Sequence, residues 1–158
     1  MILLLHCLQL LCCDYHNITL SIDIPKEIAS NEIVMIEGKL SNESENTISF
    51  WDFELFKSLY RGDNHWNIII CKEGQQYFIP SVIFGKRGNF PKIIKLKKHE
   101  KYSFQIPITF KELSTDGFLS INDVESGYYE VQLTVSLKKP KNIDIKSNII
   151  KFRLNVKD

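Results

Sequence analysis

Strict alternation of apolar and polar side chains is the feature that most constrains the fold of this 158-residue chain. The stretch Ile18–Ile24 places an apolar side chain at every second position, with Thr, Ser and Asp between them, and Pro25 ends the run. Successive side chains of a strand point to opposite faces, so this pattern predicts a strand with one face in a core. An amphipathic helix would place its apolar residues three or four positions apart.

The same reasoning predicts a series of short strands separated by polar turns. They cover residues 18–24, 34–40, 48–50, 66–72, 77–84, 93–96, 102–108, 128–137 and 150–156. Pro80 and Pro107 lack an N–H donor, which favours edge strands or bulges at those places. Because no long amphipathic helices alternate with the strands, a parallel βαβ fold is excluded. The prediction is an all-β, antiparallel sandwich of about eight or nine strands, with at most one helical turn at residues 111–117.

Length, cysteine usage and charge limit what else the chain can be. A domain of this size buries about 70% of its unfolded surface, so it needs neither a disulfide framework nor a metal. Of the four cysteines, Cys71 alone lies beyond the first thirteen residues and has no partner for a disulfide in the body of the chain. The formal net charge of +1 provides no overall field toward nucleic acid or an acidic membrane.

The first thirteen residues, MILLLHCLQLLCC, form an apolar run that stops at Asp14. As a helix this run spans about 20 Å, less than the roughly 30 Å core of a bilayer, which suits the apolar region of a signal peptide. The run resembles a lipoprotein leader in its closing pair, so Cys12 and Cys13 are candidates for lipid attachment. The alternative is a first buried strand of a cytosolic protein, for which the run is long. We expect a leader at 1–13 and an extracytoplasmic domain at 14–158.

The run Glu125–Val131, ESGYYEV, resembles the tyrosine corner of immunoglobulin-like sandwiches. In those domains an acidic-Ser-Gly turn precedes a Tyr whose hydroxyl bonds back to the backbone before the penultimate strand. Tyr129 takes that place, and Val131 stands where antibody domains have cysteine. The resemblance implies a Greek-key immunoglobulin-like sandwich in which Trp66 packs against this position. Residues 93–156 also resemble, more loosely, small immunoglobulin-like domains of bacterial exported proteins.

A search for catalytic groups finds no constellation in the sequence. Cys71 and His65 would lie roughly 20 Å apart on an extended strand, too far for a nucleophile and its base. Cys71 continues an Ile run, which predicts a buried, inert thiol. Serine-hydrolase elbows, zinc-protease motifs and phosphate loops are all missing. We therefore expect no enzyme, no catalytic residues and no cofactor.

Two clusters of charged or polar residues have simpler explanations than a ligand site. Oxygen-bearing side chains crowd the loop before the tyrosine corner, and turn chemistry explains them better than a calcium site. They are Asp116, Asn122, Asp123 and Glu125. Basic residues recur between positions 86 and 101, where lysines at turns and strand edges discourage edge pairing. We expect neither a metal nor a nucleic-acid partner.

The best candidate binding segment is 51–65, because its aromatic residues break the alternation that holds elsewhere. As a strand it would expose several rings, whereas Phe53, Phe56 and Tyr60 would share one face of a short helix. Exposed aromatic rings beside polar groups bind sugar rings or anchor side chains; the alternative is that most of the rings fill the core. The predicted binding residues are Trp51, Phe53, Phe56, Tyr60, Arg61 and His65.

These observations favour a non-enzymatic exported module that binds a protein or glycan at the cell surface through loops at one end of the sandwich. One alternative is a peptidase inhibitor that inserts the Gly85–Pro91 loop into a protease cleft. Another is an accessory subunit of a cell-surface complex. An enzyme would require a cluster of titratable groups that the sequence alone does not assemble.

Overall fold

The computed structural model describes residues 17–52, 66–77, 92–110, 124–140 and 143–156, and these residues contain strands and turns but no helix. The strands are β1 (Ile18–Asp23), β2 (Glu27–Ala29), β3 (Ile33–Asn42), β4 (Ile48–Trp51), β5 (Trp66–Lys72), β6 (Gln75–Tyr77), β7 (Ile93–Leu96), β8 (Lys101–Thr109), β9 (Gly127–Ser136), β10 (Asp144–Lys146) and β11 (Ile150–Asn155). The predicted all-β class is confirmed.

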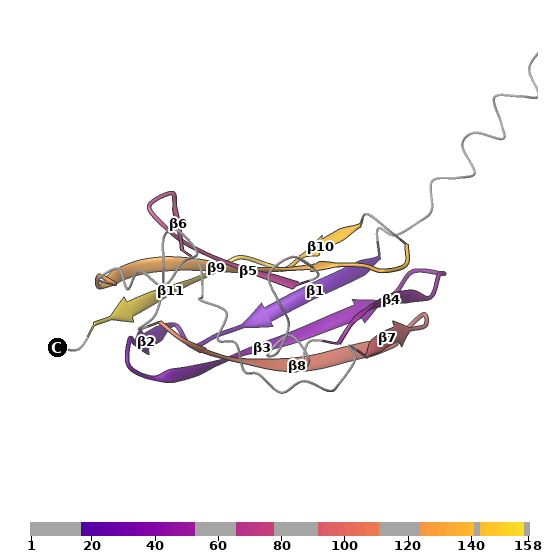
Figure 1. Cartoon of the computed structure of the whole chain (residues 1–158), viewed down its shortest axis with the longest axis horizontal. Helices are drawn as coiled ribbons and strands as arrows, with labels where there is room; N and C mark the ends of the chain where they lie inside the picture. Colours follow the sequence, from indigo (N-terminus) through magenta and orange to yellow (C-terminus); the bar gives the residue numbers. More distant parts are fainter. Residues whose placement is uncertain (1–16, 53–65, 78–91, 111–123, 141–142, 157–158) are drawn as a thin grey trace, which may run out of the picture.

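The strands form two facing layers, with a small third sheet at one end (Figure 1). One layer has the order β1-β3-β8, and the other has the order β2-β11-β9-β5-β6, with β10 paired to β9. The third sheet consists of β4 and β7. All named pairs are antiparallel except β2 with β11. The arrangement is a β-sandwich in which each layer buries one face against the other.

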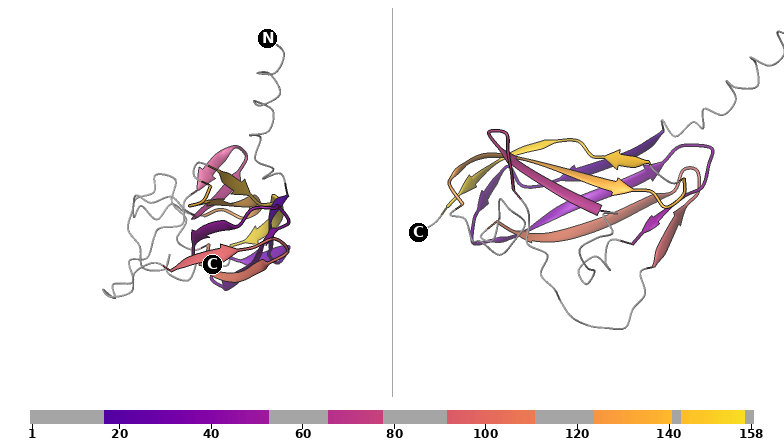
Figure 2. Two further views of the ribbon diagram at one scale, coloured as in Figure 1. Left: turned by 90° about the vertical axis from the view of Figure 1, so that its right-hand side faces the viewer. Right: turned by 45° about the horizontal axis from the view of Figure 1, so that its top comes forward.

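The connections between the layers follow an immunoglobulin-like Greek key, which the tilted view shows best (Figure 2, right). β3 lies beside β8 in one layer, and β5 lies beside β9 in the other, although several strands separate the members of each pair in the sequence. The chain therefore crosses repeatedly from one layer to the other. Adjacent strands that are distant in sequence are the mark of this fold.

The first strand is attached to both layers. β1 pairs along its length with β3, and Leu20 also forms an isolated parallel bridge with Ser147. The side chain of Asn148 continues this contact: its Oδ1 accepts from the Ile22 N–H at 2.9 Å, and its Nδ2 donates to the Ile22 carbonyl at 3.1 Å. One side of the sandwich is thereby closed by a strand that pairs within one sheet and is bridged to the edge of the other.

Burial alternates along the long strands, as the sequence pattern predicts. β1 reads buried-exposed throughout, and the inward positions of β3, including Gly38, are buried. Phe104 of β8 is the cross-strand partner of Gly38. A Cβ atom at position 38 would lie 2.0 Å from the Phe104 ring, so only glycine leaves room for that ring. Pro107 is exposed on β8, which has a strand on only one side among the described residues, as the sequence predicts.

The tyrosine corner is present. Tyr129 is fully buried, and its hydroxyl donates to the carbonyl of Glu125 at 2.9 Å. Its ring stacks on Phe152 and meets Tyr77 edge-on. The ammonium of Lys72 lies 5.6 Å from the ring centre and 2.8 Å from the Glu125 carboxylate, so the turn is held by a hydrogen bond and an ion pair.

Two expectations about β5 are wrong. Trp66 does not pack at the tyrosine corner: it pairs with Val135, and its ring contacts Phe50 and Phe104 instead. Cys71 is half-buried rather than buried, because it occupies an outward position. The strand after β5 begins at Gln75 and not at residue 77, so the turn between β5 and β6 consists of Glu73 and Gly74.

The remaining differences concern short strands that the alternation could not reveal. β2 and β10 have three residues each, too few to show a period, and they raise the strand number to eleven. Their pairing with β11 and β9 is what makes them strands. Of the predicted strand at 77–84 only Tyr77 is described, and the predicted helical turn at 111–117 lies outside the described residues.

Replacing Gly38 by Ala tests the contact with Phe104. The added methyl group overlaps the ring, so we expect the free energy of unfolding to fall by about 1–3 kcal/mol. In a Phe104→Leu background the same methyl group should cost clearly less. Lys39→Ala, at the exposed neighbouring position, is the control and should change stability by less than about 0.5 kcal/mol. Urea denaturation measures the stability of wild type and of Gly38→Ala, Phe104→Leu, their double variant and Lys39→Ala. Equal costs of the methyl group with Phe and with Leu at position 104 would contradict the contact.

Tyr129→Phe tests the tyrosine corner at neutral and alkaline pH. Loss of the bond to Glu125 should lower the free energy of unfolding by about 1 kcal/mol. Burial raises the pKa of Tyr129 above 10.0, so its neutral phenol stabilises the fold at lower pH, and this contribution is lost as pH rises above about 10 through the folded-state pKa. The variant should therefore lose stability less steeply there.

The control for this experiment is Tyr128→Phe, because that side chain is 62% exposed. The hydrogen bond to Glu125 raises the pKa of the Lys72 ammonium, so Lys72 also titrates at alkaline pH, both in wild type and in Tyr129→Phe. The difference between Tyr129→Phe and wild type therefore reports on the phenol together with its charge interaction with Lys72. Identical alkaline slopes for the two proteins would refute the assignment.

Candidate functional site

Among the predicted binding residues, Trp51 is the one that the described structure contains. Phe53, Phe56, Tyr60, Arg61 and His65 lie outside the described residues. Trp51 ends β4 and is half-buried. Its carbonyl accepts from the Trp66 indole Nε1 at 2.7 Å, and the Lys138 ammonium lies 4.3 Å from its ring centre. The backbone at Trp51 is thus fixed by a core residue, while its ring makes a cation–π contact with Lys138.

Several other predicted features lie outside the described residues as well. These are the lipidation candidates Cys12 and Cys13, the Gly85–Pro91 loop, and Asp116, Asn122 and Asp123. The fourth residue of that acidic group, Glu125, is described. Its carboxylate pairs with Lys72, whose hydrogen bond holds the pKa of Glu125 below its ordinary value. Turn and ion-pair roles therefore account for Glu125.

The surface has a small open hollow of 180 Å³, and its lining includes Asp52, the residue that follows Trp51. It lies next to β8, on the side where no described strand pairs with it, and between β8 and the small β4–β7 sheet. Its lining combines aromatic, aliphatic and polar groups. The lining residues are Asp52, Lys92, Ile94, Tyr102, Ser103, Phe104 and Gln105.

Asp52 is the best-fixed polar group of the hollow. Its backbone N–H donates to the Lys92 carbonyl at 2.8 Å, which extends the pairing of β4 with β7 by one step. The Tyr102 hydroxyl donates to Asp52 Oδ1 at 2.5 Å. A carboxylate held at its backbone and at one oxygen loses little further freedom when it binds a ligand.

An aromatic cluster supports the hollow from below. Tyr102 stacks on Phe104 with ring centres 5.8 Å apart and meets Phe50 edge-on at 5.2 Å. Trp66 contacts both Phe50 and Phe104 edge-on, at 5.9 and 5.0 Å. Such edge-on and offset contacts hold aromatic rings in fixed orientations. The walls of the hollow are therefore set by the core of the sandwich.

The alternation predicts a strand at 102–108 but does not mark Asp52, Lys92 or Gln105 as binding residues. Asp52 directly follows the predicted binding residue Trp51, and that adjacency is the one local signal for it. Lys92 belongs to the basic stretch, and nothing in the sequence places it beside Asp52. The hollow is formed by residues far apart in the chain, so only the topology brings them together.

The described lining of the hollow includes one carboxylate and one ammonium group but neither His nor Cys. Over the residues that the structure describes, His, Cys, Asp and Glu do not gather in groups of three or more that could hold a metal ion. In the same part of the chain, no helix has the length and apolar character to cross a membrane. The hollow can bind by hydrogen bonds and apolar contact.

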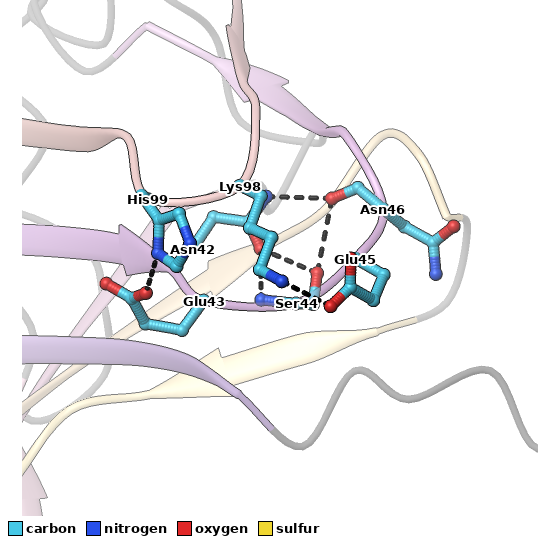
Figure 3. A network of polar contacts seen from close by, with 7 residues as sticks. All are labelled: Asn42, Glu43, Ser44, Glu45, Asn46, Lys98 and His99. Carbon is cyan, nitrogen blue, oxygen red and sulfur yellow. Dashed lines mark hydrogen bonds and ion pairs between the residues drawn. The ribbon is translucent and has the colours of Figure 1, made fainter.

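A second polar cluster joins the turn after β3 to the turn between β7 and β8 (Figure 3). Its centre is Asn42, which is fully buried. The Asn42 amide donates to the carbonyls of Asn46 and Leu96 at 2.8 and 2.9 Å, and its Oδ1 accepts from the N–H and hydroxyl of Ser44. All hydrogen-bonding groups of the amide are used within the protein. Asn42-Glu-Ser matches the N-glycosylation pattern, but this buried amide is closed to a glycan in the folded chain.

Ion pairs cover the outside of this cluster. His99 contacts Glu43 at 2.5 Å, and Lys98 pairs with Glu45. The hydrogen bond from Lys98 lowers the pKa of Glu45. These partners satisfy one another, so the cluster fastens two turns together and carries no evident ligand site.

Replacing Asn42 by Ala tests the role of this cluster. The variant leaves buried carbonyl and N–H groups without partners, so we expect the free energy of unfolding to fall by about 2–4 kcal/mol. Asn46→Ala is the matched control, because that side chain is exposed and points away from the cluster, and only its backbone carbonyl takes part (Figure 3). Urea denaturation compares the two; a loss below 0.5 kcal/mol for Asn42→Ala would show that the cluster is dispensable.

Comparisons with known proteins add only distant likenesses of fold. The sequence matches no family model and no curated protein. Two structures of a beta-glucosidase from Listeria innocua, in complex with glucose and, as a mutant, with laminaribiose, are 12% identical, with TM-scores of 0.48 and 0.47. They match 87% of this chain, which spans only 16% of the glucosidase.

A CARDB domain from Pyrococcus furiosus, in complex with di-metal ions, is 9% identical with a TM-score of 0.43. The match covers 89% of this chain and 94% of that domain. Because all three TM-scores are below 0.5, these likenesses carry no argument about activity or ligand. The fold assignment of this chain rests on its own topology and on the tyrosine corner.

Proposed function

We propose that this chain is a non-enzymatic, exported immunoglobulin-like module that binds a protein or glycan at the cell surface. The binding surface is the hollow beside β8, where Asp52, the residue after Trp51, is part of the lining. The observation that carries the proposal is the Asp52 carboxylate, held by the Tyr102 hydroxyl above an aromatic cluster. A fixed polar group beside an apolar wall is the usual composition of a recognition site.

The place of the hollow in the chain supports this function. Asp52 immediately precedes residues 53–65, and Lys92 immediately follows residues 78–91. In sequence the first segment lies between β4 and β5 and the second between β6 and β7, and the predicted aromatic binding residues belong to the first. Connecting segments placed on a rigid sandwich carry binding residues more often than the strands do.

Export and tethering are proposed from the sequence of residues 1–13. An apolar run of that length suits a signal-peptide core and is too short to span a bilayer. Cys12 or Cys13 would carry the lipid if the leader is of the lipoprotein kind. A tethered module of this size would present its hollow to partners outside the cytoplasm.

Selection of ligands by the full chain tests the proposed surface. The wild-type protein would be applied to a glycan microarray and to a phage-displayed peptide library, and each ligand obtained would be titrated against Asp52→Asn. The substitution keeps the shape of the side chain but removes its charge. We expect affinity to fall at least tenfold, equivalent to about 1.4 kcal/mol.

Asp23→Asn is the matched control, because Asp23 is an exposed residue of β1 in another part of the sandwich. Its Oδ1 accepts from the Ile24 N–H, a bond that Asn can also accept. This control should bind every ligand as the wild type does. Ligands that bind wild type and Asp52→Asn equally well would rule out the hollow as the binding surface.

A further inference from the structure

The geometry of the hollow points to its ligand class. We propose that it binds a single neutral pyranose ring of a glycan. This inference rests on the proposed function, since it names the ligand of the same surface. It follows from the size of the hollow, from the balanced charge of its described lining and from the pairing of flat polar groups with an aromatic wall.

Size limits the ligand to one ring. Pockets for drug-sized ligands usually measure about 300–1,000 Å³, whereas this hollow measures 180 Å³ and is open to solvent. By liquid volume it holds about six water molecules, which corresponds to one sugar ring and not to a folded peptide segment. The open side would leave the rest of a glycan chain outside the hollow.

Charge favours a neutral ligand. Asp52 places a negative charge at the hollow, and Lys92 places a positive charge there, with the backbones of the two residues joined by the 2.8 Å bond. An anionic sugar would meet the Asp52 carboxylate, and a cationic ligand would meet the Lys92 ammonium. A neutral polyol can instead donate to the carboxylate and accept from the ammonium, so both charges contribute hydrogen bonds.

The remaining lining completes a sugar site. Gln105, an exposed residue of β8, is part of the lining, and its Nε2 donates to the Glu37 carboxylate at 3.3 Å, so its amide oxygen would be the acceptor for a sugar hydroxyl. Tyr102, Ile94 and Phe104 supply the apolar side, against which the C–H face of a pyranose can lie. Carboxylate, amide and aromatic groups thus surround one small space, and the Tyr102–Asp52 bond fixes two of them before a ligand arrives.

Titration of the full chain with methyl glycosides tests the inference. The probes are the methyl pyranosides of glucose, galactose, mannose and N-acetylglucosamine, with glucuronate and glucosamine as charged probes. We expect at least one neutral probe to shift the ¹H–¹⁵N signals of Asp52, Ile94 and Gln105, with a dissociation constant of about 1 mM. The charged probes should bind more weakly, by at least threefold.

Gln105→Ala should weaken the binding of that neutral probe about fivefold, because it removes one hydrogen-bonding group without disturbing the core. Gln75→Ala, an exposed residue of the β5–β6 hairpin, is the matched control and should leave the binding unchanged. Absence of shifts with every neutral probe at 50-fold the expected constant, about 50 mM, would overturn the sugar assignment. So would equal binding by Gln105→Ala, or tighter binding of a charged probe.

The two proposals fail in different ways. If no sugar binds but a peptide from the library binds and depends on Asp52, the proposed function stands and the sugar assignment falls. If the binding of neither sugars nor peptides depends on Asp52, both proposals fall.

Tyr102→Phe provides a second variant for the sugar test, since it keeps the ring contacts with Phe50 and Phe104 and removes only the hydroxyl that orients Asp52.

Discussion

The space above Gly38 is the constraint on which the hollow beside β8 depends. The ring of Phe104 fills that space, and Trp66 and Tyr102 pack against Phe104 in turn. Trp66 then fixes the carbonyl of Trp51, and Tyr102 fixes the carboxylate of Asp52. A chain of contacts therefore leads from one missing side chain in the core to the Asp52 carboxylate at the hollow.

The two polar clusters of this protein differ in whether their side chains bond to one another or face solvent. In the cluster around Asn42 each amide group has its partner within the protein, which fixes two turns and leaves nothing for a ligand. At the hollow, by contrast, Lys92 and Gln105 are exposed and only Asp52 is tightly held. The first arrangement stabilises, because a buried amide without partners is costly. The second arrangement leaves donors and acceptors within reach of solvent, as recognition requires.

The sequence predicts the parts of this protein that depend on local order. Alternation is a local property, and it located the long strands, whose burial alternates as it predicts along β1 and β3. The tyrosine corner was also predictable, since its turn and its Tyr are close together in the chain. The neighbours of Trp66 were not, because they depend on a register between β5 and β9 that no local pattern encodes. The hollow was missed for the same reason: Asp52 and Lys92 are brought together by the pairing of β4 with β7.

The double attachment of β1 has a mechanical consequence. A pulling force on the chain ahead of residue 17 would act first on this strand. The pairs that join β1 to β3, from Ile18↔Asn42 to Asp23↔Glu37, run side by side along the strand, so a load along its axis would be shared among them in shear and not taken bond by bond. The Asn148 side chain and the Ser147 bridge would pass part of that load to the opposite sheet. A module tethered through its N-terminus would thus resist extension with both of its sheets at once.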